Sequence, residues 1–160
     1  MDTAAHGGQE DFEPRHAEQG AFVYTKHVVT PKHGSQLHVS FMEIPPGKSA
    51  FPYHYHDGIT EAFVILQGTA RVRTSTGDIA LGPGEVIVFP PGPPGAHRIT
   101  NVSPDEPLRY VDLDTTSIPD VIHYPDSGKT AYNVAGVPGA AWRDADQVDY
   151  YDGESDAGMS

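Results

Sequence analysis

Turn-forming residues interrupt this chain so often that only short elements fit between them. It has 17 glycines and 15 prolines among 160 residues. Between them lie short apolar runs, and the turn signals recur at intervals of about 8–12 residues, as in a β-sandwich or small barrel. No helical spacing of apolar residues over ten or more positions stands out in the middle of the chain. The sequence therefore predicts a single all-β domain.

The apolar runs give the expected strands. They cover residues 21–29, 36–44, 61–74 as two strands around a Gln67-Gly68 turn, 76–90 with a strand at 85–89, 96–103 and 108–114. In 61–67, Glu61, Phe63 and Ile65 share one side of the strand. Ala62, Val64 and Leu66 share the other side. Because both sides are largely apolar, we expect this strand to be buried on both faces, inside a sandwich.

Three segments follow from this pattern. Residues 1–20 are expected to form a polar N-terminal tail, residues 21–115 the β domain, and residues 116–160 a C-terminal extension with an acidic end. The extension is rich in turn residues, yet it contains Tyr132, Trp142, Tyr150 and Tyr151. Since four large aromatic side chains are too many for a purely disordered tail, we expect part of it to pack on the domain or on a partner subunit.

Charge and composition exclude several classes of protein. The formal net charge is −12, with most of the acidity at the two ends, so nucleic acid and anionic membrane surfaces are not expected partners. There is no cysteine for disulfides or thiolate chemistry. The first residues lack the basic and apolar regions of a signal peptide, and the longest apolar run, Ala62–Leu66, is too short to span a bilayer. A cytoplasmic location is therefore predicted.

The chemistry concentrates in the stretch "YHYHDGITE", residues 53–61. His54 and His56 are two residues apart, so in a strand they project to one face with backbones roughly 7 Å apart. The Asp57-Gly58 turn signal allows Glu61 to return towards them. His97, which follows the loop "PPGPPGA", is the best candidate for a fourth ligand. A histidine in a strand is more often a surface or hydrogen-bonded residue, but imidazoles with a carboxylate suit Mn, Fe, Ni, Cu or Zn.

Two multi-position motifs carry a family resemblance. The first runs from Gly47 through "KSAFPY", "HYH", "DGIT" and Glu61 to Gly68, and the second from Gly84 through "EVIVF", "PPG", "PPGA" and His97 to Asn101. They resemble the two conserved motifs of the cupins, with one extra residue before the histidine pair and two extra residues before His97. Over about residues 36–114, the resemblance implies a double-stranded β-helix, or jelly-roll barrel. It also implies a divalent transition metal bound by His54, His56, Glu61 and His97, and a homodimer.

Three functions are compatible with such a site. The first is a metalloenzyme acting on a small organic molecule, most plausibly a dioxygenase-like oxidoreductase in which Glu61 can also act as a general base. The second is a metal-dependent isomerase or lyase acting on a sugar or keto acid, which needs a cationic anchor. The candidate anchors are the arginines of the barrel region, Arg71, Arg73, Arg98 and Arg109. The third is a non-catalytic module that binds or senses a small ligand.

Overall fold

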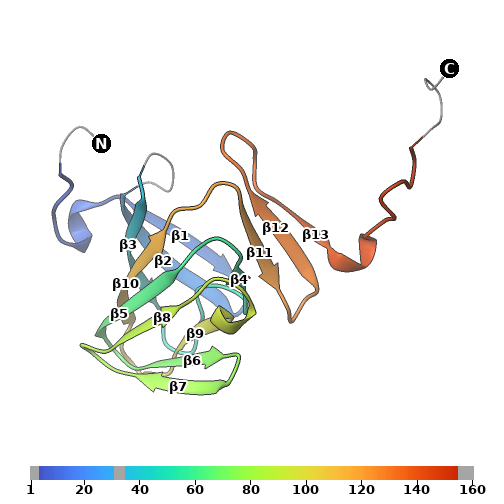
Figure 1. The fold of residues 1–160 in the computed structure, drawn as a ribbon. Helices are drawn as coiled ribbons and strands as arrows, with labels where there is room; N and C mark the ends of the chain where they lie inside the picture. Colours follow the sequence, from blue (N-terminus) through green and yellow to red (C-terminus); the bar gives the residue numbers. More distant parts are fainter. Residues whose placement is uncertain (1–3, 31–34, 155–160) are drawn as a thin grey trace.

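The computed structural model describes residues 4–30 and 35–154, and their architecture is all-β (Figure 1). In chain order the strands are β1 Pro14–Gln19, β2 Phe22–Thr30, β3 Leu37–Ile44, β4 Tyr55–His56, β5 Glu61–Gln67, β6 Ala70–Thr74, β7 Gly77–Leu81, β8 Val86–Phe89, β9 His97–Asn101, β10 Leu108–Thr115, β11 Asp120–Tyr124, β12 Lys129–Asn133 and β13 Ala140–Arg143. Three short 3-10 helices, η1 Gln9–Asp11, η2 Pro93–Gly95 and η3 Asp144–Asp146, complete the described elements. The all-β prediction is confirmed.

Two antiparallel sheets make the body of the molecule. The larger has the strand order β1-β2-β3-β10-β5-β8, and the smaller has the order β7-β6-β9. The outer strand β1 lies in the segment that the sequence pattern assigned to a polar tail, and it pairs with β2 along its whole length. Its alternation was not visible in the sequence, because its side chains are almost all polar and exposed.

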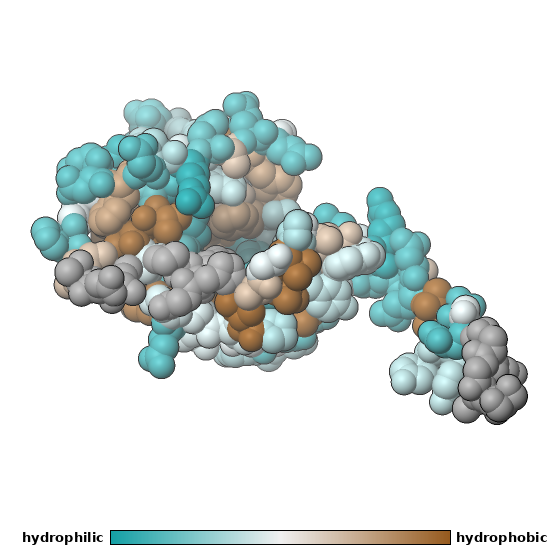
Figure 2. Space-filling view, turned by 90° about the horizontal axis from the view of Figure 1, so that it is seen from above, coloured by the Kyte–Doolittle hydropathy of each residue, from teal (hydrophilic) through white to brown (hydrophobic). Residues whose placement is uncertain are grey.

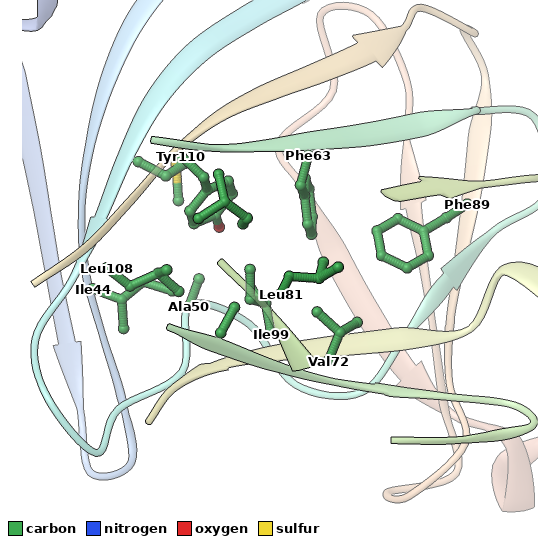
Figure 3. Close-up of a cluster of buried hydrophobic side chains, with 12 residues drawn as sticks. Ile44, Ala50, Phe63, Val72, Leu81, Phe89, Ile99, Leu108 and Tyr110 are labelled. Atoms are coloured by element: carbon green, nitrogen blue, oxygen red, sulfur yellow. The ribbon is translucent and has the colours of Figure 1, made fainter. Parts of the chain in front are cut away.

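The space between the two sheets holds the hydrophobic core (Figure 3). β3, β5 and β10 contribute Met42, Ile65 and Tyr110, and the smaller sheet contributes Val72 and Ile99, all nearly inaccessible to solvent. Complete burial of a large apolar side chain stabilises a fold by about 1.5–3 kcal/mol. Packing of the two sheets against each other is therefore the main source of stability. Such packing is expected for a turn-rich chain whose elements are short strands.

β5 differs from the prediction in one respect. Glu61, Phe63 and Ile65 face inwards as expected, but Leu66 on the opposite face is 49% exposed. The prediction that this strand is buried on both faces is wrong within the described chain. Its apolar outer face continues onto β8, where Val86 and Val88 are 59% and 58% exposed.

The C-terminal segment forms a third sheet, with the order β13-β12-β11-β4. β11 joins it to the barrel by pairing with β4, where Ile122 lies opposite His56 and His123 opposite Tyr55. Beyond β13 the chain projects away from the barrel (Figures 1 and 2). No helix in the described residues is long and apolar enough to cross a membrane.

Candidate metal centre

The four predicted ligand residues come from separate elements that meet at one end of the barrel. His54 and His97 lie in neighbouring extended segments, joined by two backbone hydrogen bonds of 3.1 and 2.9 Å. His56 lies in β4, and Glu61 is the first residue of β5. All four side chains are buried. The turn after Asp57 therefore does what its sequence suggests, since it returns the chain so that Glu61 faces the histidine pair.

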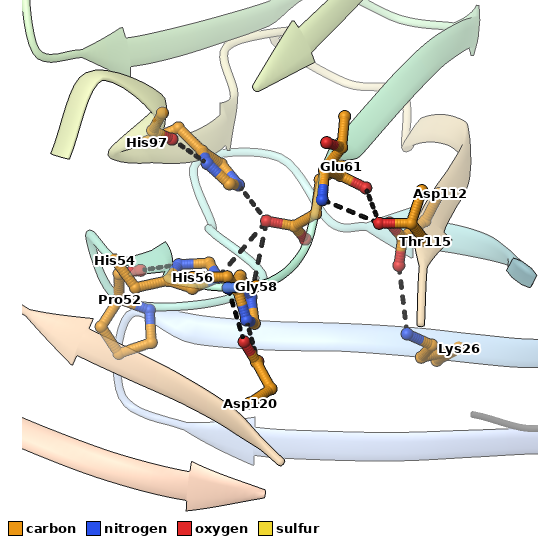
Figure 4. A network of polar contacts seen from close by, with 12 residues as sticks. Lys26, Pro52, His54, His56, Gly58, Glu61, His97, Asp112, Thr115 and Asp120 are labelled. Carbon is orange, nitrogen blue, oxygen red and sulfur yellow. Dashed lines mark hydrogen bonds and ion pairs between the residues drawn. The ribbon is translucent and has the colours of Figure 1, made fainter. Parts of the chain in front are cut away.

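The three imidazoles converge on one carboxylate oxygen (Figure 4). The Nε2 atoms of His54, His56 and His97 lie 3.9, 3.6 and 3.4 Å from Oε2 of Glu61. Two atoms each about 2.1 Å from one ion are about 3.0 Å apart at a right angle and about 4.2 Å apart across it. The observed separations fall within this range.

The other ring nitrogens decide which tautomers the histidines adopt. Nδ1 of His54 lies 2.8 Å from the Pro52 carbonyl, and Nδ1 of His97 lies 2.9 Å from the Gly95 carbonyl. A carbonyl only accepts, so each Nδ1 must carry the proton, which in a neutral ring leaves a lone pair on Nε2. These lone pairs point at an acceptor oxygen, an arrangement that a cation stabilises.

His97 gives an independent indication of the same kind. Its Nε2 is buried and has no hydrogen-bond partner among the described residues. His54, His56 and Glu61 alone form a group whose ligand atoms lie within 4.8 Å of one another and can hold a metal ion. His97 lies outside that group, but its Nε2 is 3.4 Å from Oε2 of Glu61, which makes His97 a candidate for a fourth ligand of a transition metal.

The proline-rich loop before His97 fixes the position of this histidine. Gly92 N–H donates a 2.7 Å hydrogen bond to the carbonyl of His56, which ties the loop to β4. At Gly95 a Cβ atom would lie 1.8 Å from the carbonyl oxygen of Pro90, so only glycine fits there. The ring of His97 also stacks on Phe89, with centroids 3.7 Å apart. The longer loop, which contains η2, therefore still leads His97 to Glu61.

Asp120 is a site residue that the sequence analysis missed. It is 1% exposed, and its Oδ2 accepts a 2.5 Å hydrogen bond from Nδ1 of His56. Its Oδ1 accepts a 3.3 Å bond from the backbone N–H of Gly58. A carboxylate behind a ligating histidine fixes its tautomer and raises its basicity. No spacing rule connects positions 56 and 120, and the one signal available was an acid at the start of the apolar run "DVIHY".

A cavity of about 130 Å³ opens beside the histidines. Its lining comprises Lys26, Phe51, His54, His56, Glu61, Asp112, Asp114, Ile122 and Tyr124. Lys26 Nζ lies 3.1 Å from Oδ2 of Asp112, which also accepts a 3.2 Å hydrogen bond from Ser40. The carboxylates of Glu61, Asp112 and Asp114 lie within 4.8 Å of one another. The chamber is therefore polar on the barrel side.

β11 supplies the less polar part of the same chamber. Tyr124 lies parallel to the ring of His54, with centroids 6.0 Å apart. Burial, and then the nearby carboxylates Asp120 and Glu61, raise the pKa of Tyr124 above its ordinary value, so its hydroxyl remains a hydrogen-bond donor. The C-terminal segment thus contributes Ile122 and Tyr124 to the chamber as well as Asp120 behind it.

The arginines proposed as anchors lie elsewhere. Among the described lining residues of this chamber there is no arginine. Arg71 and Arg73 have half-exposed side chains that face Asp78 and Asp126, and Arg109 pairs with Glu43. Among the described lining residues, Lys26 is the cationic side chain of the chamber. Its position in the predicted strand 21–29 did not indicate that it lines a site.

The fold and the site define a jelly-roll barrel with an inward-facing cluster of three histidines and a glutamate. A family model described as "Cupin domain" matches residues 40–114. The chain belongs to the cupin superfamily. The double-stranded β-helix expected from the two motifs is thereby confirmed.

Solved structures of the same fold include three with informative descriptions. A putative sugar phosphate isomerase from Acidithiobacillus ferrooxidans is 23% identical, with a TM-score of 0.75 over 87% of this chain and 90% of its own. A sugar phosphate isomerase from Silicibacter pomeroyi is 20% identical, with a TM-score of 0.75 over 89% and 95%. A predicted oxalate decarboxylase from Thermotoga maritima is 19% identical, with a TM-score of 0.61 over 72% and 100%. Comparison with curated proteins gave no match.

Proposed function

We propose that this protein is a metalloenzyme that catalyses proton transfer on a small, oxygen-bearing organic molecule, as isomerases and lyases do. The observation that carries the proposal is the composition of one chamber. There, His54 and His56 stand beside a cluster of carboxylates and a lysine, and the Nε2 atom of His97 approaches the same glutamate. Two of the structurally similar proteins are described as sugar phosphate isomerases, which is consistent with this class of reaction.

His54, His56, Glu61 and His97 would hold a divalent transition metal, such as Mn, Fe, Ni, Cu or Zn. When bound, such an ion polarises a carbonyl or hydroxyl oxygen of the substrate. Glu61 is the predicted catalytic residue, because its carboxylate faces both the imidazoles and the chamber and can accept a proton. Asp112 and Asp114 lie close enough to pass that proton on. Tyr124 can donate a hydrogen bond to a substrate oxygen.

Solvent exchange tests the proposal. Metal-loaded protein is incubated in D₂O with aldose sugars, their phosphates and 2-oxo acids, and deuterium incorporation next to the carbonyl is followed by NMR. We expect the wild-type protein to catalyse exchange and the Glu61→Gln variant to lose it. The control variant Arg71→Gln, which is changed outside the chamber, should retain exchange. Equal exchange rates with and without the protein on every substrate would count against proton-transfer catalysis.

A dioxygenase is the second candidate, because a donor set of imidazoles with one carboxylate is also used by redox-active iron, copper and nickel. Oxygen uptake by iron- or copper-loaded protein with diketones, phenols and thiols separates it from an isomerase. Ligand binding without either deuterium exchange or oxygen uptake would favour the third hypothesis, a non-catalytic binding or sensing module. A cytoplasmic location stays a prediction of the sequence.

We also propose a homodimer formed through the outer face of the larger sheet. Exposed Leu66, Val86 and Val88 lie on adjacent strands and form one apolar surface, and such surfaces commonly mark interfaces. Two copies of a chain with net charge −12 repel each other, but contact through this uncharged patch places no acidic side chains opposite one another. A second copy is therefore the partner we propose for the patch. Sedimentation should show a dimer that Val88→Glu dissociates. A monomeric wild-type protein at micromolar concentration would refute the interface.

A further inference from the structure

A groove of about 340 Å³ adjoins the metal chamber. The two spaces share Lys26 and Phe51 in their linings, so they meet at these side chains. The inner chamber, of about 130 Å³, is the smaller of the two spaces. A substrate that fills it can extend past Lys26 into the groove.

The groove carries charge of the opposite sign to the rest of the protein. Its basic lining residues are Arg15, His16, Lys26 and His38, and none of its described lining residues is a carboxylate. Across the whole chain, 22 acidic residues stand against 10 lysines and arginines. A surface hollow whose charged lining residues are all basic is therefore a local departure from composition, and it borders the chamber at Lys26 and Phe51.

Strand register places the two cations together. Arg15 of β1 is directly opposite Lys26 of β2, so their side chains share a face. Like charges at opposed positions destabilise a sheet unless an anion lies between them. Lys26 has one partner in Asp112, which uses one of its three donors. Over the described part of the chain, the guanidinium of Arg15 makes no hydrogen bond or ion pair, so its five donors remain available.

We propose that Arg15 and Lys26 bind an anionic group of the substrate, a phosphate or a carboxylate, while its other end reaches the metal chamber. The substrate is then a small molecule with oxygen donors at one end and an anion at the other. The proposal rests on the function proposed above only for the end of the substrate that reaches the metal chamber. Arg15, on an edge strand outside residues 40–114, is the specificity-determining residue.

Matched ligand pairs test this assignment by titration calorimetry on the full-length, metal-loaded protein. One pair is ribose 5-phosphate and ribose. The other is 2-oxoglutarate and 2-oxobutyrate, which share a chelating end and differ in the distal carboxylate. A hydrogen bond to a charged group is strong enough that we expect the more anionic member of at least one pair to bind about tenfold tighter or more. The pair that shows the preference identifies the anion.

Substitution then assigns the effect to its residue. Arg15→Gln should abolish the preference, Arg15→Lys should keep most of it, and Arg71→Gln, an exposed arginine elsewhere, should not change it. No preference in either pair, or equal behaviour of Arg15→Gln and Arg71→Gln, overturns the proposal. Metal content and deuterium exchange are measured separately. If the protein binds no metal and catalyses no exchange but still shows Arg15-dependent anion binding, the anion site stands and the proposed function fails. If it binds metal and catalyses exchange without any Arg15-dependent preference, the proposed function stands and the anion site fails.

Discussion

Replacing Asp120 with Asn should weaken metal binding although Asp120 is not a ligand. The carboxylate accepts two hydrogen bonds, from Nδ1–H of His56 at 2.5 Å and from Gly58 N–H at 3.3 Å. An amide has one accepting oxygen, so the variant keeps one of these bonds and turns an NH₂ group towards the other donor. If the oxygen faces Gly58, His56 loses the partner that fixes its tautomer.

Loss of such a partner lowers metal affinity by about 10- to 100-fold, or about 1.4–2.7 kcal/mol. Competition of Zn²⁺ or Mn²⁺ against a chromophoric chelator measures the change. Asp126→Asn is the control, because Asp126 pairs on the surface with Arg73 and lies outside the chamber lining. A folded Asp120→Asn protein that binds metal as tightly as the wild type would refute the reasoning.

Three further predictions concern the same site. His56→Ala should reduce bound metal from close to one equivalent per chain to a small fraction by elemental analysis, and full retention would exclude the proposed ligand set. Added metal should stabilise the folded protein by about 2.7 kcal/mol at a hundredfold excess over Kd, or about 5–10 °C in Tm by scanning calorimetry; an unchanged Tm would contradict a folded-state site. Gly95→Ala should cost about 1–3 kcal/mol, because its Cβ would overlap the Pro90 carbonyl. Gly139→Ala, with nothing within 4 Å, should cost less, and equal chemical denaturation midpoints would show that the loop has space to adjust.

The local part of this structure was predictable from the sequence. Alternation in residues 61–67 gave the inward face of β5, and glycine and proline gave the strand ends. The same-face rule for residues two apart paired His54 with His56, and the turn at Asp57 brought back Glu61. These are short-range consequences of backbone geometry, so they depend on few residues and survive in any fold that contains the strands.

The missed features all depend on long-range pairing. Lys26 entered the chamber because β3 alone separates β2 from β10 in the larger sheet, and Asp120 reached His56 because β11 pairs with β4. Nothing in a single sequence specifies which distant strands become neighbours. The exposed outer face of β5 was missed for a related reason, because an apolar run reads the same whether protein or solvent covers it.

The position of β10 also has a consequence for folding. It lies between β3 and β5 in the larger sheet, yet it is the last strand of the barrel to be synthesised. Neighbouring hairpins such as β2–β3 and β6–β7 can form early, but β3 and β5 gain their shared neighbour only when residues 108–115 arrive. Such non-local pairing slows folding, and it leaves apolar strands exposed while the ribosome finishes the chain. We therefore expect a nascent chain to become less prone to aggregation when β10 closes the barrel.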